Sequence, residues 1–259
     1  MSILLDIAGL SCGFGGVSAL ADVGLGIERG LVFAVIGPNG AGKSTLLNAA
    51  TGLLEPAAGR IRFDGDDITG WATHRIVARG IARTFQNGRL FGRLSALENV
   101  MVGGHARLAS GFGAALLGTP GFGREEAGLA ARSLALLDRL GMADIAGMPV
   151  GALPYGKRRQ VELARALVSE PRLLLLDEPA AGLNSAEVEE LIGFLAGLRA
   201  EGLTIVVIEH NMGLVMRLAD RIAVLNFGKL IAEGRPGEIQ RNEAVLEAYL
   251  GRGHGHAVV

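Results

Sequence analysis

The chain has 259 residues, enough for one large domain with a substantial core, and 25 basic against 26 acidic side chains give it a formal net charge of −1. This balance gives no electrostatic sign of a nucleic-acid groove, and no apolar run approaches the ~20 residues needed to span a bilayer. The first residues, "MSILLDIAGL", lack a basic flank and are predicted to form a strand rather than a signal peptide.

Short apolar runs alternate with helical stretches that end at glycines, a pattern that indicates an α/β core. The runs at 31–36, 173–177 and 204–209 are apolar almost throughout. This is typical of central strands in a parallel sheet that is covered by helices on both faces.

The first of these strands runs into "GPNGAGKST", which fits the phosphate-loop pattern G-x-x-x-x-G-K-[ST] and is followed by a helical stretch. Its glycines let the backbone approach phosphate oxygens, and the helix N-terminus adds partial positive charge. Lys43 would place a charge beside the β and γ phosphates, and Ser44 would offer a hydroxyl to Mg²⁺. The predicted nucleotide-binding residues here are Gly37, Pro38, Asn39, Gly40, Ala41, Gly42, Lys43, Ser44 and Thr45.

Between about residues 87 and 170 the sequence changes to helical periodicity with glycine-rich breaks. We predict a mostly helical insert there. The stretch 103–123 contains too many glycines for one long helix.

The next apolar strand ends in two carboxylates, in "RLLLLDEP". By itself such a pair could simply cap a buried strand, but a phosphate loop elsewhere in the chain gives it a chemical role. Asp177 is predicted to hold Mg²⁺, and Glu178 to polarise the attacking water as general base. Pro179 ends the strand because it has no N–H to donate. Ser185 is predicted to cap the following helix, which Gly202 stops.

With this phosphate loop and these acids, nearly the whole chain resembles the ATP-binding cassette (ABC) ATPases that drive membrane transporters. The resemblance implies an α/β fold, the P-loop NTPase cassette, with a mainly parallel sheet core, an antiparallel β portion near the N-terminus and a helical subdomain insert. It implies one ATPase domain over 1–251, with the catalytic core at 1–86 and 171–251, the insert at about 87–170, and a flexible tail at 252–259.

The resemblance assigns roles to four further positions. Gln86 in "ARTFQN" matches the glutamine that contacts Mg²⁺ and water and senses the membrane subunit. His210 in "VIEHNM" matches the switch histidine that contacts the γ-phosphate. Phe14 lies where the family stacks an aromatic ring on adenine, with a buried core phenylalanine as the alternative. "AAGLNSAE", residues 180–187, corresponds to the loop that crosses the dimer interface.

"LPYGK", residues 153–157, occupies the position of the family signature, usually LSGGQ. Pro154 removes the serine hydroxyl that would donate to the γ-phosphate. Gly156 is retained, and a helix that starts near it still offers free N–H groups to an anion. Because one copy's phosphate loop meets another copy's signature, the resemblance implies a second ATPase subunit, identical or related, that faces the first head to tail.

The stretch from "ARTFQN" to "GGHAR", the altered signature, "AGLN", "VIEHNMGLVM" and "VLEAYLG" together resemble the ATPases of branched-chain amino acid importers. The resemblance implies ATP and Mg²⁺ as cofactors and transmembrane permease subunits as partners. An external solute-binding protein would take part indirectly, and no nucleic acid is expected. The protein would lie peripherally on the cytoplasmic face of the inner membrane. Such systems also import amides, urea or small carboxylates, so the solute stays open.

Other functions stay open from the sequence. The ATPase of an exporter would share the catalytic residues. A soluble cassette ATPase that acts on ribosomes or nucleic acid usually has two cassettes or long coiled coils, and the chain has neither heptads nor a second phosphate loop. A regulatory nucleotide binder without catalysis would not need the full set of Lys43, Ser44, Asp177, Glu178 and His210. We predict that two domains close on two Mg·ATP and signal through Gln86 and the insert.

Overall fold

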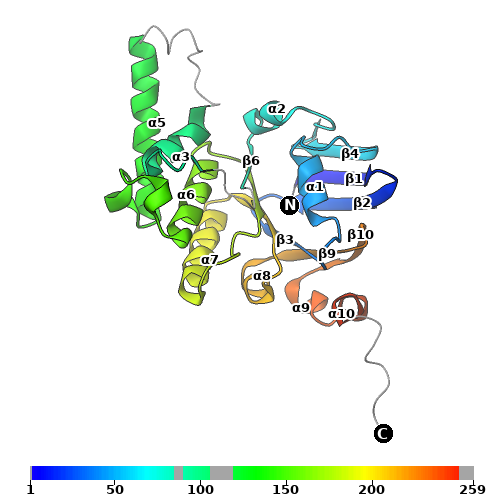
Figure 1. Ribbon diagram of the computed structural model, residues 1–259. Coiled ribbons are helices and arrows are strands. Elements are labelled where there is room, and N and C mark those ends of the chain that lie inside the picture. Colours follow the sequence, from blue (N-terminus) through cyan, green and yellow to red (C-terminus); the bar gives the residue numbers. More distant parts are fainter. Residues whose placement is uncertain (1, 85–89, 106–118, 251–259) are drawn as a thin grey trace.

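The structure, a computed structural model, describes residues 2–84, 90–105 and 119–250, without the side chains of Phe14 and Leu250. These residues form two sheets and several helices, which Figure 1 shows in sequence colours. In the part of the chain described, no helix combines the length and the apolar character needed to cross a membrane.

A six-stranded sheet forms the centre of the fold. Its strands are β3 (Val32–Ile36), β6 (Ile81–Arg83), β7 (Leu173–Asp177), β8 (Thr204–Ile208), β9 (Arg221–Asn226) and β10 (Lys229–Gly234). In space the order is β10-β9-β3-β8-β7-β6, and all neighbours are parallel except β9 and β10. The three predicted central strands, β3, β8 and β7, lie side by side, and every residue in them is buried.

A second sheet, antiparallel throughout, is built from the N-terminal part of the chain. Its strands are β1 (Ile3–Phe14), β2 (Val17–Glu28), β4 (Ala58–Phe63) and β5 (Asp66–Asp67). They are arranged in the order β2-β1-β4-β5, and β1 and β2 form a long hairpin. The predicted fold class, a mainly parallel core with an antiparallel portion near the N-terminus and added helices, is confirmed.

The helices of the described residues differ widely in length. They are α1 (Lys43–Ala50), α2 (Thr73–Ala78), α3 (Ala96–Gly104), α5 (Pro120–Arg139), α6 (Tyr155–Leu167), α7 (Ser185–Ala200), α8 (Met212–Leu218), α9 (Pro236–Ile239) and α10 (Glu243–Leu250). Two short 3₁₀ turns, Ala143–Ile145 and Val150–Ala152, connect α5 to α6.

The two faces of the central sheet have different covers. Alternate residues of β3 point to opposite faces. Phe33 joins a core with α1 and the antiparallel sheet, whereas Ala34 joins a core with α7 and α8. The expectation of helices on both faces is therefore wrong for part of one face. The antiparallel sheet lies there because its own apolar side, which includes Phe63, also has to be hidden from water.

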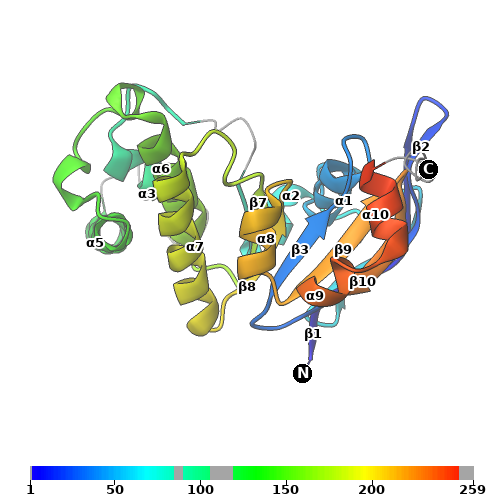
Figure 2. The ribbon, with the colours of Figure 1, turned by 90° about the horizontal axis from the view of Figure 1, so that it is seen from below.

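A third core holds α3, α5 and α6 together. Val100, Leu137 and Val161, one from each helix, are fully buried in it. Figures 1 and 2 both show this helical group on one side of the central strands, with α1 and the antiparallel strands on the other side. The residues described between 90 and 170 are thus mostly helical and have a core of their own.

The N-cap of α7 is Asn184, which corrects the expectation for Ser185. The Asn184 side chain accepts a hydrogen bond from the Glu187 N–H (3.0 Å), and the Glu187 carboxylate accepts one from the Asn184 N–H (2.9 Å). This capping box satisfies two N–H groups at once. Three residues after Ser185 stands Val188, whose side chain has no acceptor to complete such a pair.

Candidate active site

The segment predicted to bind phosphate connects β3 to α1. Gly37 has a φ of +147°, and a Cβ there would lie 2.0 Å from the Leu225 carbonyl oxygen. Gly40 has a φ of +79°, but no described atom lies within 4 Å of the place its Cβ would take. Glycine is thus required at Gly37 for space and at Gly40 for conformation. Gly37, Ala41 and Lys43 are buried, Pro38, Gly42 and Thr45 half-buried, and Asn39, Gly40 and Ser44 exposed.

Lys43 points into the loop that precedes it. Its ammonium donates to the carbonyl oxygens of Gly37 (2.7 Å) and Pro38 (2.9 Å), and the side chain is largely buried. Burial lowers the pKa of Lys43 from its ordinary value, and the negative charges of Glu178 and Asp177 act in the opposite direction. The predicted phosphate-binding lysine and the predicted acids therefore share one electrostatic environment.

Asp177, at the end of β7, forms a buried ion pair that the sequence interpretation missed. Its carboxylate accepts a hydrogen bond from Arg83 Nη2 (2.9 Å), and both side chains are less than a tenth exposed. Arg83 also donates to Asn48 of α1 (2.8 Å) and to Thr51, the C-cap residue of that helix (3.2 Å). The guanidinium thus links the predicted Mg²⁺ ligand to the helix that follows the phosphate loop. The only signal in the sequence was an arginine in the "ARTFQN" motif.

Glu178 and His210 lie next to each other at the ends of β7 and β8. His210 Nδ1 is 3.6 Å from Glu178 Oε1, with the histidine side chain 63% exposed and the glutamate 21% exposed. Glu178 has a φ of +48°, a conformation that costs a residue with a Cβ about 1–3 kcal/mol. Its N–H donates to the Ile208 carbonyl (2.9 Å), which fixes it beside β8. The strained backbone holds the predicted general base at the edge of the site.

Glu209 is a second residue that the sequence interpretation missed. It is fully buried, and its carboxylate accepts hydrogen bonds from the N–H groups of Ala180 (2.8 Å), His210 (3.1 Å) and Asn211 (3.2 Å). Three donors compensate for the loss of water around this charge. Glu209 thereby joins the loop after the strand acids to the backbone of His210. The available signal was an acid at the end of the apolar run "LTIVVIEH".

Helix α6, which begins in the signature segment, lies in the helical group, whereas α1, which follows the phosphate loop, lies on the other side of the central strands (Figures 1 and 2). Pro154 directly precedes α6, and the helix starts at Tyr155. Gly156 is buried, and a Cβ there would lie 2.1 Å from Glu187 Oε1. The structure thus brings Lys43, Asp177, Glu178 and His210 together, and places Gly156 beside the start of α7 rather than at the phosphate loop.

The side chains of two predicted site residues, Gln86 and Phe14, are not among those that the structure describes. Gln86 lies outside the described residues. The backbone of Phe14 ends β1, opposite Val17, but its side chain is outside the described groups, so neither the adenine contact nor the buried alternative is tested. Among the residues described, no group of three or more His, Cys, Asp or Glu side chains is placed to hold a metal ion.

A cavity of about 340 Å³ lies between the helical group and the central sheet. Thr84 and Phe91, which flank the undescribed segment around Gln86, line it together with Arg83, Val102 of α3 and Arg165 of α6. Burial lowers the pKa of the Arg165 guanidinium. We call this the docking cavity. It lies against the Arg83–Asp177 ion pair on one side and the helical group on the other.

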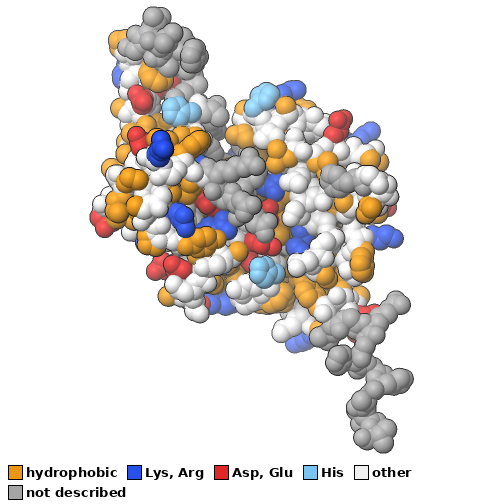
Figure 3. Space-filling model, viewed as in Figure 1, with side chains coloured by type: hydrophobic (Ala, Val, Ile, Leu, Met, Phe, Trp, Pro, Cys, Tyr) orange, Lys and Arg blue, Asp and Glu red, His pale blue; other side chains and the backbone are white. Residues whose placement is uncertain are grey.

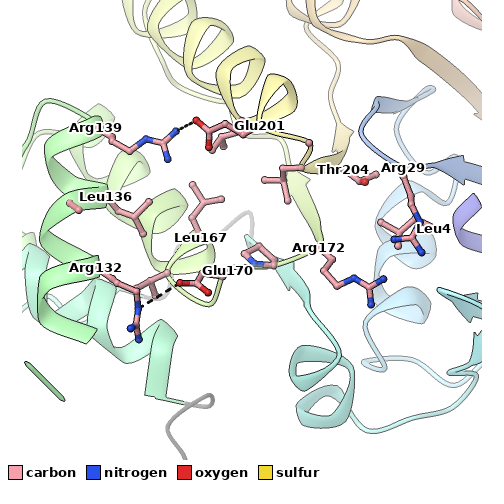
Figure 4. Close-up of a pocket in the computed structure, with 16 residues that line it drawn as sticks. Leu4, Arg29, Arg132, Leu136, Arg139, Leu167, Glu170, Arg172, Glu201 and Thr204 are labelled. Atoms are coloured by element: carbon pink, nitrogen blue, oxygen red, sulfur yellow. Dashed lines mark hydrogen bonds and ion pairs between the residues drawn. The ribbon is translucent and has the colours of Figure 1, made fainter. Parts of the chain in front are cut away.

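A larger cavity of about 580 Å³ lies at the opposite ends of the parallel strands. Figure 4 shows Arg132 and Arg139 of α5 on one side of it, joined to Glu170 (3.8 Å) and Glu201 (2.5 Å), with Leu136 and Leu167 between them. On the other side Arg29 and Arg172 both pair with Asp64. In open α/β sheets, ligands bind at the carboxyl ends of the strands, where Asp177 and the phosphate loop lie. This cavity is at the wrong end for the predicted nucleotide chemistry.

The surface charge is mixed. On the face drawn in Figure 3, basic and acidic side chains are interspersed between apolar ones, with no large area of one sign. The near-neutral formal charge of −1 agrees with this view. This face does not have the basic stripe that typically marks a nucleic-acid-binding surface.

Comparison with known families gives two matches. A family model described as "ABC transporter" matches residues 20–181, and one described as "Branched-chain amino acid ATP-binding cassette transporter" matches residues 229–255. The high-affinity branched-chain amino acid transport ATP-binding protein BraF of Pseudomonas aeruginosa is 43% identical over 96% of this chain and 98% of its own length. The corresponding LivG protein of Escherichia coli is 41% identical over 96% and 98%.

Solved structures give the same result at the level of the fold. A nucleotide-free ATP-binding cassette from an ABC transporter matches with a TM-score of 0.85 at 29% identity, over 97% of this chain and 100% of that one. The ADP conformation of such a cassette also has a TM-score of 0.85, at 30% identity over 97% and 100%. A dimeric post-hydrolysis cassette bound to ADP and phosphate matches with 0.75 at 25% identity, over 90% and 99%.

Proposed function

This chain belongs to the ABC transporter family of ATPases, and on that premise we propose that it powers a membrane importer of branched-chain amino acids or related small solutes. Its activity as a family member is ATP binding and hydrolysis. The observation that carries the choice of importer is the combination of 43% identity to BraF along nearly the whole chain with the separate family match at residues 229–255.

The catalytic assignment rests on the residues that the fold gathers at the strand ends. Glu178 is proposed as the general base that takes a proton from the attacking water, with His210 beside it at 3.6 Å to contact the γ-phosphate. Lys43 and the loop N–H groups would hold the β and γ phosphates. Phe14 would stack on the adenine.

Mg²⁺ is the metal that this set of side chains fits. Ser44 offers an exposed hydroxyl at the start of α1, Asp177 offers a carboxylate, and Gln86 is proposed as a third protein ligand. Mg²⁺ usually takes only one or two protein carboxylates and completes its shell with water and phosphate oxygens, so a cluster of acids is not required. When bound, it would neutralise negative charge on the phosphates.

A second ATPase subunit is proposed to complete each site. Gly156 and the other N–H groups at the start of α6 lie apart from the phosphate loop of their own chain, so they would contact nucleotide held by the partner. The head-to-tail pair would close on two nucleotides. The dimeric relative bound to ADP and phosphate supports this arrangement.

Permease subunits are the proposed membrane partners, with an external solute-binding protein acting through them. The docking cavity suits such a contact because it touches both the helical group and Arg83, which is bonded to Asp177. A permease segment seated there would lie one side chain away from the metal-binding carboxylate. The chain would thus work peripherally, at the cytoplasmic face of the inner membrane. The division into a core at 1–86 and 171–251 and an insert at about 87–170 is part of the same proposal.

The test is to purify the complex from membranes with a tagged chain and to identify what stays bound. We expect a pair of permeases, and ATP hydrolysis that rises when a solute-binding protein loaded with leucine, isoleucine or valine is added to the reconstituted complex. If a binding protein loaded with an amide or urea stimulates hydrolysis instead, the transported solute belongs to that related class. Outward transport without a solute-binding protein would favour an exporter, and recovery with ribosomes but no permease would overturn the transport role.

A further inference from the structure

Tyr155 stands in the signature segment where the family pattern has glycine, and its side chain makes contacts that glycine lacks. The phenol hydroxyl donates to the carbonyl oxygen of Ala181 (3.1 Å) and accepts from Arg159 Nε (3.0 Å). Ala181 belongs to the loop directly after Asp177 and Glu178. A helix of the insert is therefore hydrogen-bonded to the loop that carries the catalytic acids of the same chain.

The shape of that loop fits the tyrosine ring. Gly182 has a φ of +76°, and a Cβ there would lie 2.8 Å from Tyr155 Cε1. The ring thus packs directly on the backbone of Gly182, where any larger residue would push it away. Arg159 also contacts this ring, and its guanidinium carbon lies 5.4 Å from the ring centre. Arg159 is itself fixed by a largely buried ion pair with Glu162 (2.8 Å).

A second contact joins the same two elements. The Glu187 carboxylate, which caps α7, lies where a Cβ of Gly156 would project, only 2.1 Å from that point. The first turn of α6 thus packs closely on the first turn of α7, because Gly156 places no side chain between them. This contact fixes the spacing of the two helix starts, and Tyr155 fixes α6 relative to the loop between β7 and α7.

The hydrogen bonds continue from this loop to the general base. The Ala181 N–H donates to the Glu178 carbonyl (3.1 Å), and the neighbouring Ala180 N–H is held by Glu209. Glu209 also holds the backbone of His210. The backbone of this loop is therefore held from the insert, by Tyr155 at the Ala181 carbonyl, and from the core, by Glu209 at the Ala180 N–H.

We propose that Tyr155 is a positioning residue that couples the placement of α6 to the orientation of Glu178 in the same chain. When α6 moves toward nucleotide on a partner subunit, the Tyr155 hydroxyl moves the loop that contains Ala181 in the same direction. This movement brings Glu178 into the orientation needed for hydrolysis. This rests on the proposed role of Glu178. In this signature Pro154 lacks the hydroxyl that would contact the γ-phosphate, and Tyr155 instead makes a contact within its own chain, to Ala181.

The test compares Tyr155→Phe, which keeps the ring and removes the hydroxyl, with Gln160→Ala on the same helix, whose side chain donates to Glu190 (3.4 Å) and accepts from Lys157 (3.0 Å). In the purified transport complex we expect kcat for ATP hydrolysis to fall about two- to tenfold in Tyr155→Phe, as loss of one hydrogen bond allows. The KM for ATP should stay at the wild-type value, and the melting temperature should fall by no more than about 5 °C. Gln160→Ala should leave all three unchanged.

A second variant, Tyr155→Gly, restores the family residue but leaves the loop untied, so its kcat should fall further than that of Tyr155→Phe. A rise in KM with unchanged kcat would show that Tyr155 contacts nucleotide or partner instead, and would overturn the proposal. So would an unchanged kcat in both Tyr155 variants. Glu178→Gln is assayed in parallel: if it hydrolyses ATP like the wild type, the assignment of the base has failed, whatever Tyr155 does.

Discussion

The phosphate loop and the signature segment are two halves of one proposed nucleotide site, and they are built in different ways. At the phosphate loop the backbone itself is fixed, because Gly37 is packed against Leu225 and leaves no room for a side chain. At the start of α6, Pro154 and Tyr155 are exposed, and side-chain contacts to the next loop hold the helix. Substitutions in the phosphate loop should therefore have large effects, whereas the effects of substitutions in the signature segment should depend on which side-chain contact is lost.

The largest loss of stability is expected for Gly37→Ala. A Cβ 2.0 Å from the Leu225 carbonyl forces the strand or the loop to shift, and the φ of +147° is unfavourable for alanine. We expect the free energy of unfolding to fall by about 2–3 kcal/mol or more in urea titrations without nucleotide. Gly40→Ala, which adds a Cβ away from all described atoms, should cost about 1 kcal/mol from conformation alone. Equal losses in the two variants would contradict the packing argument.

A smaller effect, on binding rather than folding, is expected for Lys43→Ala. Its ammonium is the buried charge beside the acids, and loss of a charge-assisted contact to phosphate should weaken ATP binding by roughly 10- to 100-fold. Lys157→Ala is the matched control, since Lys157 in the signature segment donates to Gln160 of its own helix (3.0 Å). Calorimetric titration of the isolated chain should show wild-type affinity for the control. Weaker ATP binding by Lys157→Ala together with wild-type affinity in Lys43→Ala would contradict this assignment of the phosphate-binding lysine.

The smallest effect is expected at the cavity of Figure 4, far from both halves of the site. The Arg139–Glu201 pair joins the helical group to the core, but its side chains are 44% and 57% exposed. An exposed ion pair contributes about 0–1 kcal/mol, so Arg139→Ala should change the free energy of unfolding by no more than that. ATP hydrolysis should be unaffected. A loss of activity at unchanged stability would show that this cavity has a role in the cycle.

The features that were predicted correctly from the sequence depend on residues that are close together in the chain. The phosphate loop, the strand-end acids and the parallel strands were all predicted because each depends on a short local pattern. Even the capping error was local, since Glu187 stands three residues after Asn184 and not after Ser185. The site roles themselves stay predictions until they are measured.

The residues that the sequence did not reveal act across long separations. Arg83 and Asp177 are 94 positions apart, Glu209 and Ala180 are 29 apart, and Tyr155 and Ala181 are 26 apart. No periodicity or motif encodes such pairs, because they form only when the strands and the insert are assembled. The same holds for the antiparallel sheet, whose position over one face of the core depends on packing between distant segments.

Hydrolysis by Glu178→Gln tests most directly whether the site at the strand ends is catalytic. We expect ATP binding close to wild type and turnover reduced by about 10²–10⁴-fold, the range typical of a lost general base. Glu189→Gln is the control, because Glu189 is exposed on α7 and pairs with Arg217. It should hydrolyse ATP normally. Wild-type turnover in Glu178→Gln would remove the proposed base, and with it the mechanism built on the strand-end acids.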